Sequence, residues 1–113
     1  MRRTNLTFLA ASLLLFGCFD PTAPLQPPCR EPAPLTGTFD PRVPDYIVIF
    51  HDGVDARQET TRLAAQYGFE PLGVWEHALL GFWAPPTREV VASLRCEASI
   101  KHVQHNAVYT IGD

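Results

Sequence analysis

The residues able to take part in acid–base, nucleophilic or metal chemistry are few in this chain and poorly spaced for it. His51 and Asp52 are adjacent at the end of an expected strand, so their side chains point to opposite faces. His102 and His105 lie three positions apart on another expected strand, which also separates them and argues against a shared metal ion. No serine or free thiol is evident as a nucleophile for His51 and Asp52. We therefore expect no enzyme, no cofactor and no metal site.

Net charge and chain length exclude further classes of function. The chain has 113 residues, and its 9 basic and 12 acidic residues give a formal net charge of −3. No basic run is present that would neutralise phosphates, so nucleic acid is a poor candidate partner. A chain of this length can build one small domain, which leaves little room for a deep catalytic cleft.

Residues 1–17 have the pattern of an export signal of the lipoprotein type. Arg2 and Arg3 form a positively charged N-terminal region, and Leu6 to Phe16 form an apolar segment too short to span a bilayer. The sequence ending in Gly17-Cys18 resembles the bacterial lipobox, in which the cysteine is lipidated and becomes the new N-terminus. Ordinary cleavage nearby, with Cys18 as a spare thiol, is the alternative.

A lipid on Cys18 would anchor the protein to a membrane. Phe19 and Asp20 follow that cysteine and do not form the usual signal for retention at the inner membrane. We therefore expect an outer-membrane or surface lipoprotein of the bacterial cell envelope, and a secreted or periplasmic protein if no lipid is attached.

The two cysteines after the signal allow two readings. Cys29 and Cys96 can form a disulfide in an oxidising compartment, or Cys96 can be a free thiol and Cys29 an unpartnered linker residue.

Residues 18–44 are rich in proline, which removes backbone donors and favours extended conformations. We expect this segment to be a tether that does not itself fold.

The domain is expected to occupy residues 45–113. Its strands are predicted at Tyr46–His51, Leu72–Trp75, Leu79–Ala84 and Ile100–Gln104, and its first helix at Ala56–Tyr67, between a capping box at Asp55 and a stop at Gly68. A second helix, capped at Thr87, includes Val90 to Ala98. This order predicts an α+β fold, a ferredoxin-like βαββαβ sandwich with an antiparallel four-stranded sheet and two helices on one face.

The predicted strands do not alternate apolar and polar residues, as the strands of a sheet with one solvent-exposed face would. Every position from Tyr46 to Phe50 is apolar, so both faces of the sheet require burial although two short helices can cover only one. The uncovered face would be a protein interface, unless edge strands or twist cover it. We assign six residues to it, with Trp83 as a further candidate: Tyr46, Val48, Phe50, Trp75, Leu80 and Phe82.

The last residues continue past the final strand without a helix signal or an obvious partner strand. An extended segment of this kind can bind another protein through its backbone, with alternate side chains entering pockets. The alternative is a frayed end. This tail consists of Ala107, Val108, Tyr109, Thr110, Ile111, Gly112 and Asp113.

The segment from Asp45 to Asp113 resembles the inhibitor I9 family, which comprises the propeptide domains of subtilisin-like proteases and free-standing inhibitors. The matching residues are Tyr46-Ile47-Val48-Ile49-Phe50 with Asp52-Gly53-Val54, His77-Ala78-Leu79 with Gly81-Phe82, Leu94-Arg95, and Val103. Each piece is short, and their order and spacing together carry the resemblance.

The resemblance implies that the chain inhibits a subtilisin-like serine protease. In this family the open sheet face packs on two surface helices of the protease, and the tail lies in the substrate groove like the acyl half of a cleaved substrate. Tyr109 would then enter the pocket four residues before the cleavage point, with Ile111 and Gly112 near the catalytic serine. In the other register, Asp113 occupies the primary pocket and Thr110 the fourth.

Family members often carry acidic residues just after the last strand, where they cap helices of the enzyme. Those positions are Gln104, His105 and Asn106 here, and Glu76 in the hairpin can supply a charge instead. No protease domain follows Asp113, so we expect a free-standing inhibitor that is a monomer when free. The alternatives are a folding aid acting in trans on a subtilase and a ferredoxin-like envelope module that binds another ligand.

Overall fold

The structure is a computed structural model that describes residues 25–107. The predicted signal segment and Cys18 therefore lie outside the described residues. So do the tail positions Val108, Tyr109, Thr110, Ile111, Gly112 and Asp113.

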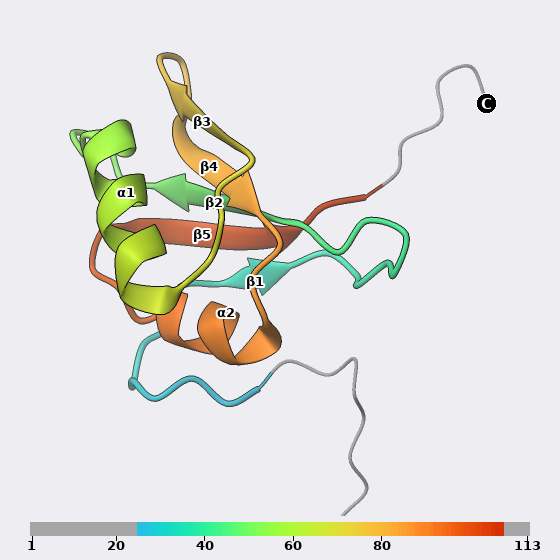
Figure 1. Cartoon of the computed structure of the whole chain (residues 1–113). Coiled ribbons are helices and arrows are strands. Elements are labelled where there is room, and N and C mark those ends of the chain that lie inside the picture. The colour runs from blue at the N-terminus through green and yellow to red at the C-terminus, as the bar shows by residue number, and fades with distance from the viewer. Residues whose placement is uncertain (1–24, 108–113) are drawn as a thin grey trace, which may run out of the picture.

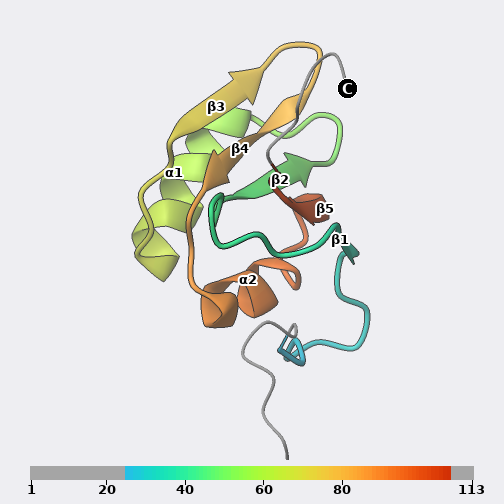
Figure 2. The same ribbon diagram turned by 90° about the vertical axis from the view of Figure 1, so that its right-hand side faces the viewer.

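The fold is a mixed α/β arrangement with one open sheet and two helices. The elements in chain order are β1 (Leu35–Thr36), β2 (Tyr46–Phe50), α1 (Ala56–Tyr67), β3 (Gly73–Glu76), β4 (Leu80–Ala84), α2 (Arg88–Leu94) and β5 (Ile100–His105). The strands lie side by side in the order β1-β5-β2-β4-β3, and both helices pack on the same face of the sheet (Figures 1 and 2).

The expected four-stranded antiparallel sheet is wrong in strand count, because the sheet has five strands. The additional strand, β1, pairs in parallel with β5, with Leu35 opposite Val103, whereas the other pairings are antiparallel. β1 lies within the segment expected to be an unfolded tether, so that expectation is also wrong for Leu35–Thr36. Cys29 and Cys96 form a disulfide with their Cα atoms 5.7 Å apart, which holds this segment against the domain.

The bounds of α1 follow from local signals. The side chain of Asp55 accepts a hydrogen bond from the Gln58 amide at 3.1 Å, which satisfies one of the free donors of the first turn. Gly68 ends the helix in the left-handed conformation, with φ of 75°, where glycine carries no steric penalty. The predicted range Ala56–Tyr67 is therefore confirmed.

The second helix is shorter than predicted. Thr87 caps it as expected, through a 3.2 Å bond from the Val90 amide to its side chain. The helix ends at Leu94, so Ala98 lies outside it. The Cys96 amide bonds to the Ser93 carbonyl at 3.0 Å, a tight turn that ends the helical pattern just where the disulfide begins.

The core lies between the sheet and the two helices. Its largest fully buried side chains include Val48 and Phe50 of β2, Phe82 of β4, Leu63 of α1 and Leu94 of α2. Because α1 and α2 both contribute to this one cluster, neither of the two helices in residues 25–107 covers the opposite face of the sheet.

Candidate interaction surface

The face of the sheet away from the helices is built by alternate residues of β2, β4 and β3. Ile47 pairs with Trp83, and Trp75 lies opposite Gly81 on the neighbouring strand. Side chains alternate along a strand, so these residues share one face with Ile49, opposite the buried Val48. We call Ile47, Ile49, Trp75 and Trp83 the open face, and each of the four is only partly buried.

The indole rings of Trp75 and Trp83 form the part of the open face that lies over β3 and β4. The Trp75 and Trp83 rings stack with centroids 4.8 Å apart and an interplanar angle of 30°. Gly73 makes room for this pair, because a Cβ there would meet the Trp83 ring. Gly81 serves the sheet backbone instead, since a Cβ there would lie 2.2 Å from the Val48 carbonyl oxygen. The result is a flat apolar surface beside the edge strand β3.

The predicted interface residues lie mostly on the wrong face. Only Trp75 belongs to the open face, and the other five residues pack in or against the core: Tyr46, Val48, Phe50, Leu80 and Phe82. The physical cause is the period of two along a strand, because a shift by one position exchanges the two faces completely. With every position of β2 apolar, no polar residue indicates which set is buried.

The residues that the prediction missed are Ile47 and Ile49. Each lies between two core residues of β2, and pairing with β4 places Ile47 beside Trp83. The alternation along the strand separates the two sets of positions but does not tell which set is buried. Once Tyr46, Val48 and Phe50 are assigned to the core, the positions between them must face away from it.

β5 adds polar groups to the open face. His102 lies opposite Ile49, and Gln104 lies opposite Ile47. The ring nitrogen Nε2 of His102 and the hydroxyl of Thr36 are 3.0 Å apart, which links β5 to β1 across this face. The open face is therefore apolar over β2, β3 and β4 and polar toward β5 and β1.

The root of the predicted tail is held beside the start of β2. The Asn106 amide donates to the Asp45 carbonyl at 3.0 Å, so the chain remains paired for one residue beyond β5. The His105 ring packs against Tyr46, with centroids 4.8 Å apart, and burial lowers the pKa of His105. Ala107, the first tail residue, follows this ordered end, and its amide donates to the Asn106 side-chain oxygen at 2.9 Å.

The three capping candidates are placed differently. Glu76 lies on the helix side and pairs with Arg57 of α1 at 2.6 Å, so its charge is already engaged. The side-chain oxygen of Asn106 accepts the hydrogen bond from Ala107. Gln104 is the candidate that faces the open side of the sheet.

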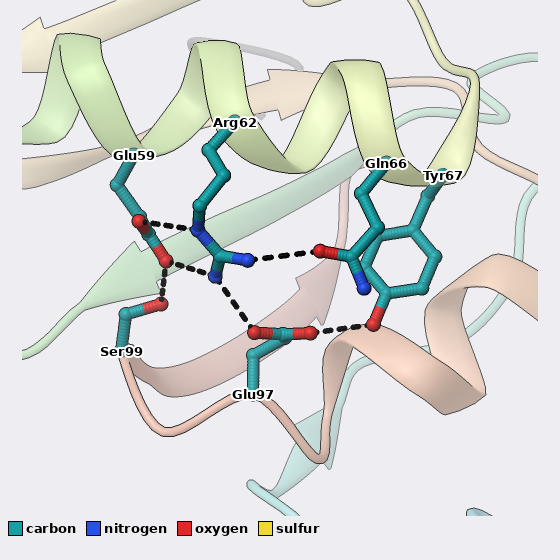
Figure 3. A network of polar contacts seen from close by, with 6 residues as sticks. All are labelled: Glu59, Arg62, Gln66, Tyr67, Glu97 and Ser99. Carbon is teal, nitrogen blue, oxygen red and sulfur yellow. Dashed lines mark hydrogen bonds and ion pairs between the residues drawn. The ribbon is translucent and has the colours of Figure 1, made fainter.

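On the helix side of the sheet, a polar cluster joins α1 to the segment between α2 and β5 (Figure 3). Arg62 of α1 pairs with Glu59 at 2.6 Å and with Glu97, after α2, at 2.8 Å. Glu59 also accepts from the Ser99 hydroxyl at 2.7 Å, and Tyr67 donates to Glu97. The hydrogen bond from Arg62 is the main cause that lowers the pKa of Glu59, whereas burial, followed by the bond to Glu97, raises the pKa of Tyr67 to about 12. This cluster fixes α1 to the connection between α2 and β5.

Within residues 25–107 no group of three or more His, Cys, Asp or Glu side chains is arranged to hold a metal ion. None of the helices in that range is long and apolar enough to cross a membrane. Comparison of the sequence with protein-family models and with curated proteins gives no match.

Proposed function

We propose that the chain is a proteinaceous inhibitor of subtilisin-like serine proteases. It binds the protease through the open face of its sheet and inserts its C-terminal tail into the substrate groove. The observation that carries the proposal is the open face itself. Four apolar side chains lie on the helix-free side of the sheet, next to the strand from which the tail departs.

The fold is consistent with this assignment at the level of strand order. From β2 onward, strands and helices alternate as βαββαβ, and the four strands lie in the order β5-β2-β4-β3. This order supports the ferredoxin-like arrangement that the inhibitor I9 resemblance implies. β1 is an addition at the outer edge of β5, on the far side of β5 from the strands that carry the open face.

The contact residues differ from those first assigned. Ile47, Ile49, Trp75 and Trp83 would pack on the protease surface, with the two stacked indoles as the largest contact. Tryptophan side chains dominate the binding energy of many interfaces because they bury a large area at low entropic cost. Gln104, which lies on the same face, would accept hydrogen bonds from the enzyme in place of the acidic residues of the family.

The ordered root of the tail supports the second half of the proposal. Residues Asn106 and Ala107 are fixed by bonds to Asp45 and to each other, so the segment after them starts from a defined position. A defined start lowers the entropic cost of placing Tyr109 to Gly112 in a groove.

Truncation separates the two parts of the contact. A chain that ends at Asn106 retains the open face and lacks the tail. We expect it to bind a subtilisin more weakly than the full chain and to leave hydrolysis of a small chromogenic peptide uninhibited. Equal inhibition by the full and truncated chains would show that the tail does not enter the groove.

A further inference from the structure

The segment 29–36, which we call the strap, is fixed to the domain at both ends. At its start Cys29 is bonded to Cys96, which lies just after α2. At its end Leu35–Thr36 forms β1, the outermost strand beside β5. The strap thus runs from the end of α2 to the edge of the sheet (Figure 1).

Between its two ends the strap is hydrogen-bonded to Arg95 and to β5. The Ala33 amide donates to the Arg95 carbonyl, and the Arg95 side chain donates through Nε to the Ala33 carbonyl, both at 2.7 Å. The Val103 amide donates to the Pro34 carbonyl at 2.9 Å. Arg95 is adjacent to Cys96, so the covalent bond and the paired hydrogen bonds hold the same point of the fold.

The strap protects the edge of β5. Without β1, β5 would be an edge strand with one row of backbone groups open to solvent or to another chain. Val103 of β5 is fully buried, and Ala33 and Leu35 pack against the same core. The strap therefore completes both the hydrogen bonding and the packing on this side of the sheet.

The strap is also continuous with the root of the tail. Gly37, directly after β1, lies against the backbone of His105, and the Phe39 ring meets the His105 ring edge-on at 6.1 Å. The same connection then reaches Asp45, whose carbonyl accepts the Asn106 amide. Displacing the strap would therefore disturb the end of β5 from which the tail leaves.

The non-covalent contacts of the strap come from a short segment. β1 contains two residues, and Pro32 and Pro34 in the strap have no amide hydrogen to donate. A short segment with few hydrogen bonds does not readily offset the conformational entropy lost when it is ordered. The disulfide supplies the missing constraint, because it keeps the start of the strap next to the end of α2 even when the hydrogen bonds break.

We propose that the Cys29–Cys96 bond is a redox lock that keeps the strap on β5 and fixes the root of the tail. Closing the lock converts two thiols into a disulfide and releases two protons and two electrons. A small-molecule disulfide such as oxidised glutathione accepts these and becomes two thiols. The regulatory part of this inference rests on the proposed function, because it makes the oxidised chain the competent inhibitor and the reduced chain a weak one.

Amide hydrogen exchange tests the lock directly. The chain with Cys18→Ser contains only the two cysteines of the lock, so a dithiol reductant acts on that bond alone. On reduction we expect exchange at Val103 and Asn106 to accelerate by about ten-fold or more, while Leu63 in α1 keeps its protection. A further variant with Cys29→Ser and Cys96→Ser should exchange like the reduced chain without any reductant.

Two exchange results would overturn the proposal. Unchanged exchange at Val103 would mean that the hydrogen bonds alone hold the strap. An equal loss of protection at Leu63 would mean global unfolding rather than local release.

Inhibition of a subtilisin by the same samples separates the lock from the proposed function. Inhibition about ten-fold weaker after reduction supports the regulatory role, and equal inhibition by both redox forms contradicts it. If neither form inhibits while exchange at Val103 still differs, the proposed function fails and the lock stands.

Discussion

The indole ring of Trp83 occupies the space in which a side chain at Gly73 would lie. The two residues are register partners on β4 and β3, and a Cβ added at Gly73 would come within 2.1 Å of the ring. The same ring stacks on Trp75. The missing side chain at Gly73 therefore allows the two indoles to form the flat part of the open face.

Gly73→Ala should displace the Trp83 ring and break the stack with Trp75. We expect the free energy of unfolding to fall by about 1 kcal/mol and the near-ultraviolet circular dichroism of the indole pair to decrease. Inhibition should weaken by a larger factor than the loss of folded protein alone would cause, because the displaced ring belongs to the proposed contact.

The control for this variant is a double-mutant cycle with Trp83→Ala. Once the ring is gone, Gly73→Ala should have almost no further effect, since the three heavy atoms nearest to that Cβ all belong to the Trp83 ring. An alanine effect of the same size in both backgrounds would contradict the contact between Gly73 and Trp83.

Two neighbouring residues of β2 distinguish the open face from the core. Ile49→Ala should reduce inhibition by about ten-fold and lower the free energy of unfolding by about 1 kcal/mol or less. Val48→Ala, which empties a buried site, should cost about 2 kcal/mol and leave inhibition by the folded protein unchanged. Urea unfolding and protease titration measure the two effects, and the reverse pattern would place the interface on the other face.

Elements with local signals could be predicted from the sequence. The range of α1 follows from the Asp55 cap and the Gly68 stop, which act within a few residues of the helix. The strands β2 to β4 follow from their apolar runs, to within one residue at each end, and the predicted strand Ile100–Gln104 ends one residue short of β5. β1 could not be predicted, because a two-residue parallel strand is stabilised by contacts distant in sequence: the bond to Cys96 and the pairing with Val103.

The assignment of the open face failed for a different reason. Which set of alternate residues is buried depends on how the helices pack, and the uniformly apolar sequence from Tyr46 to Phe50 contains no information on it. Gly81 does not resolve it: the residue pairs with Trp75, but a Cβ there would strike the Val48 backbone carbonyl, a clash that does not depend on which face is buried.

The polar cluster of Figure 3 should make stability depend on pH in acid. The folded state lowers the pKa of Glu59 below its ordinary value of 4.5, mainly through the hydrogen bond from Arg62. This contribution is present above pH 4.5 and is lost as the pH falls through the lower folded value. Glu59→Gln should therefore lower stability by about 1 kcal/mol at neutral pH, and the difference should shrink in acid. Denaturant midpoints across this range check the prediction, which a constant difference would contradict.

Tyr67 should cause the opposite dependence in alkali. Its pKa is raised from 10.0 to about 12, so its contribution is complete below pH 10 and is lost as the pH rises through 12. Tyr67→Phe should cost about 1 kcal/mol at neutral pH, through the lost bond to Glu97, and should lose less stability than the wild type above pH 10. Parallel curves for the two proteins would mean that Tyr67 ionises equally easily in the folded and unfolded states.

We propose that the chain inhibits a subtilisin-like protease through both its open face and its tail. Steady-state hydrolysis of a chromogenic peptide by a subtilisin tests this, at several substrate concentrations and with increasing amounts of the oxidised full chain. We expect competitive inhibition, in which the apparent KM rises and kcat does not change. Hydrolysis that is unaffected up to high micromolar concentrations of the chain would contradict it.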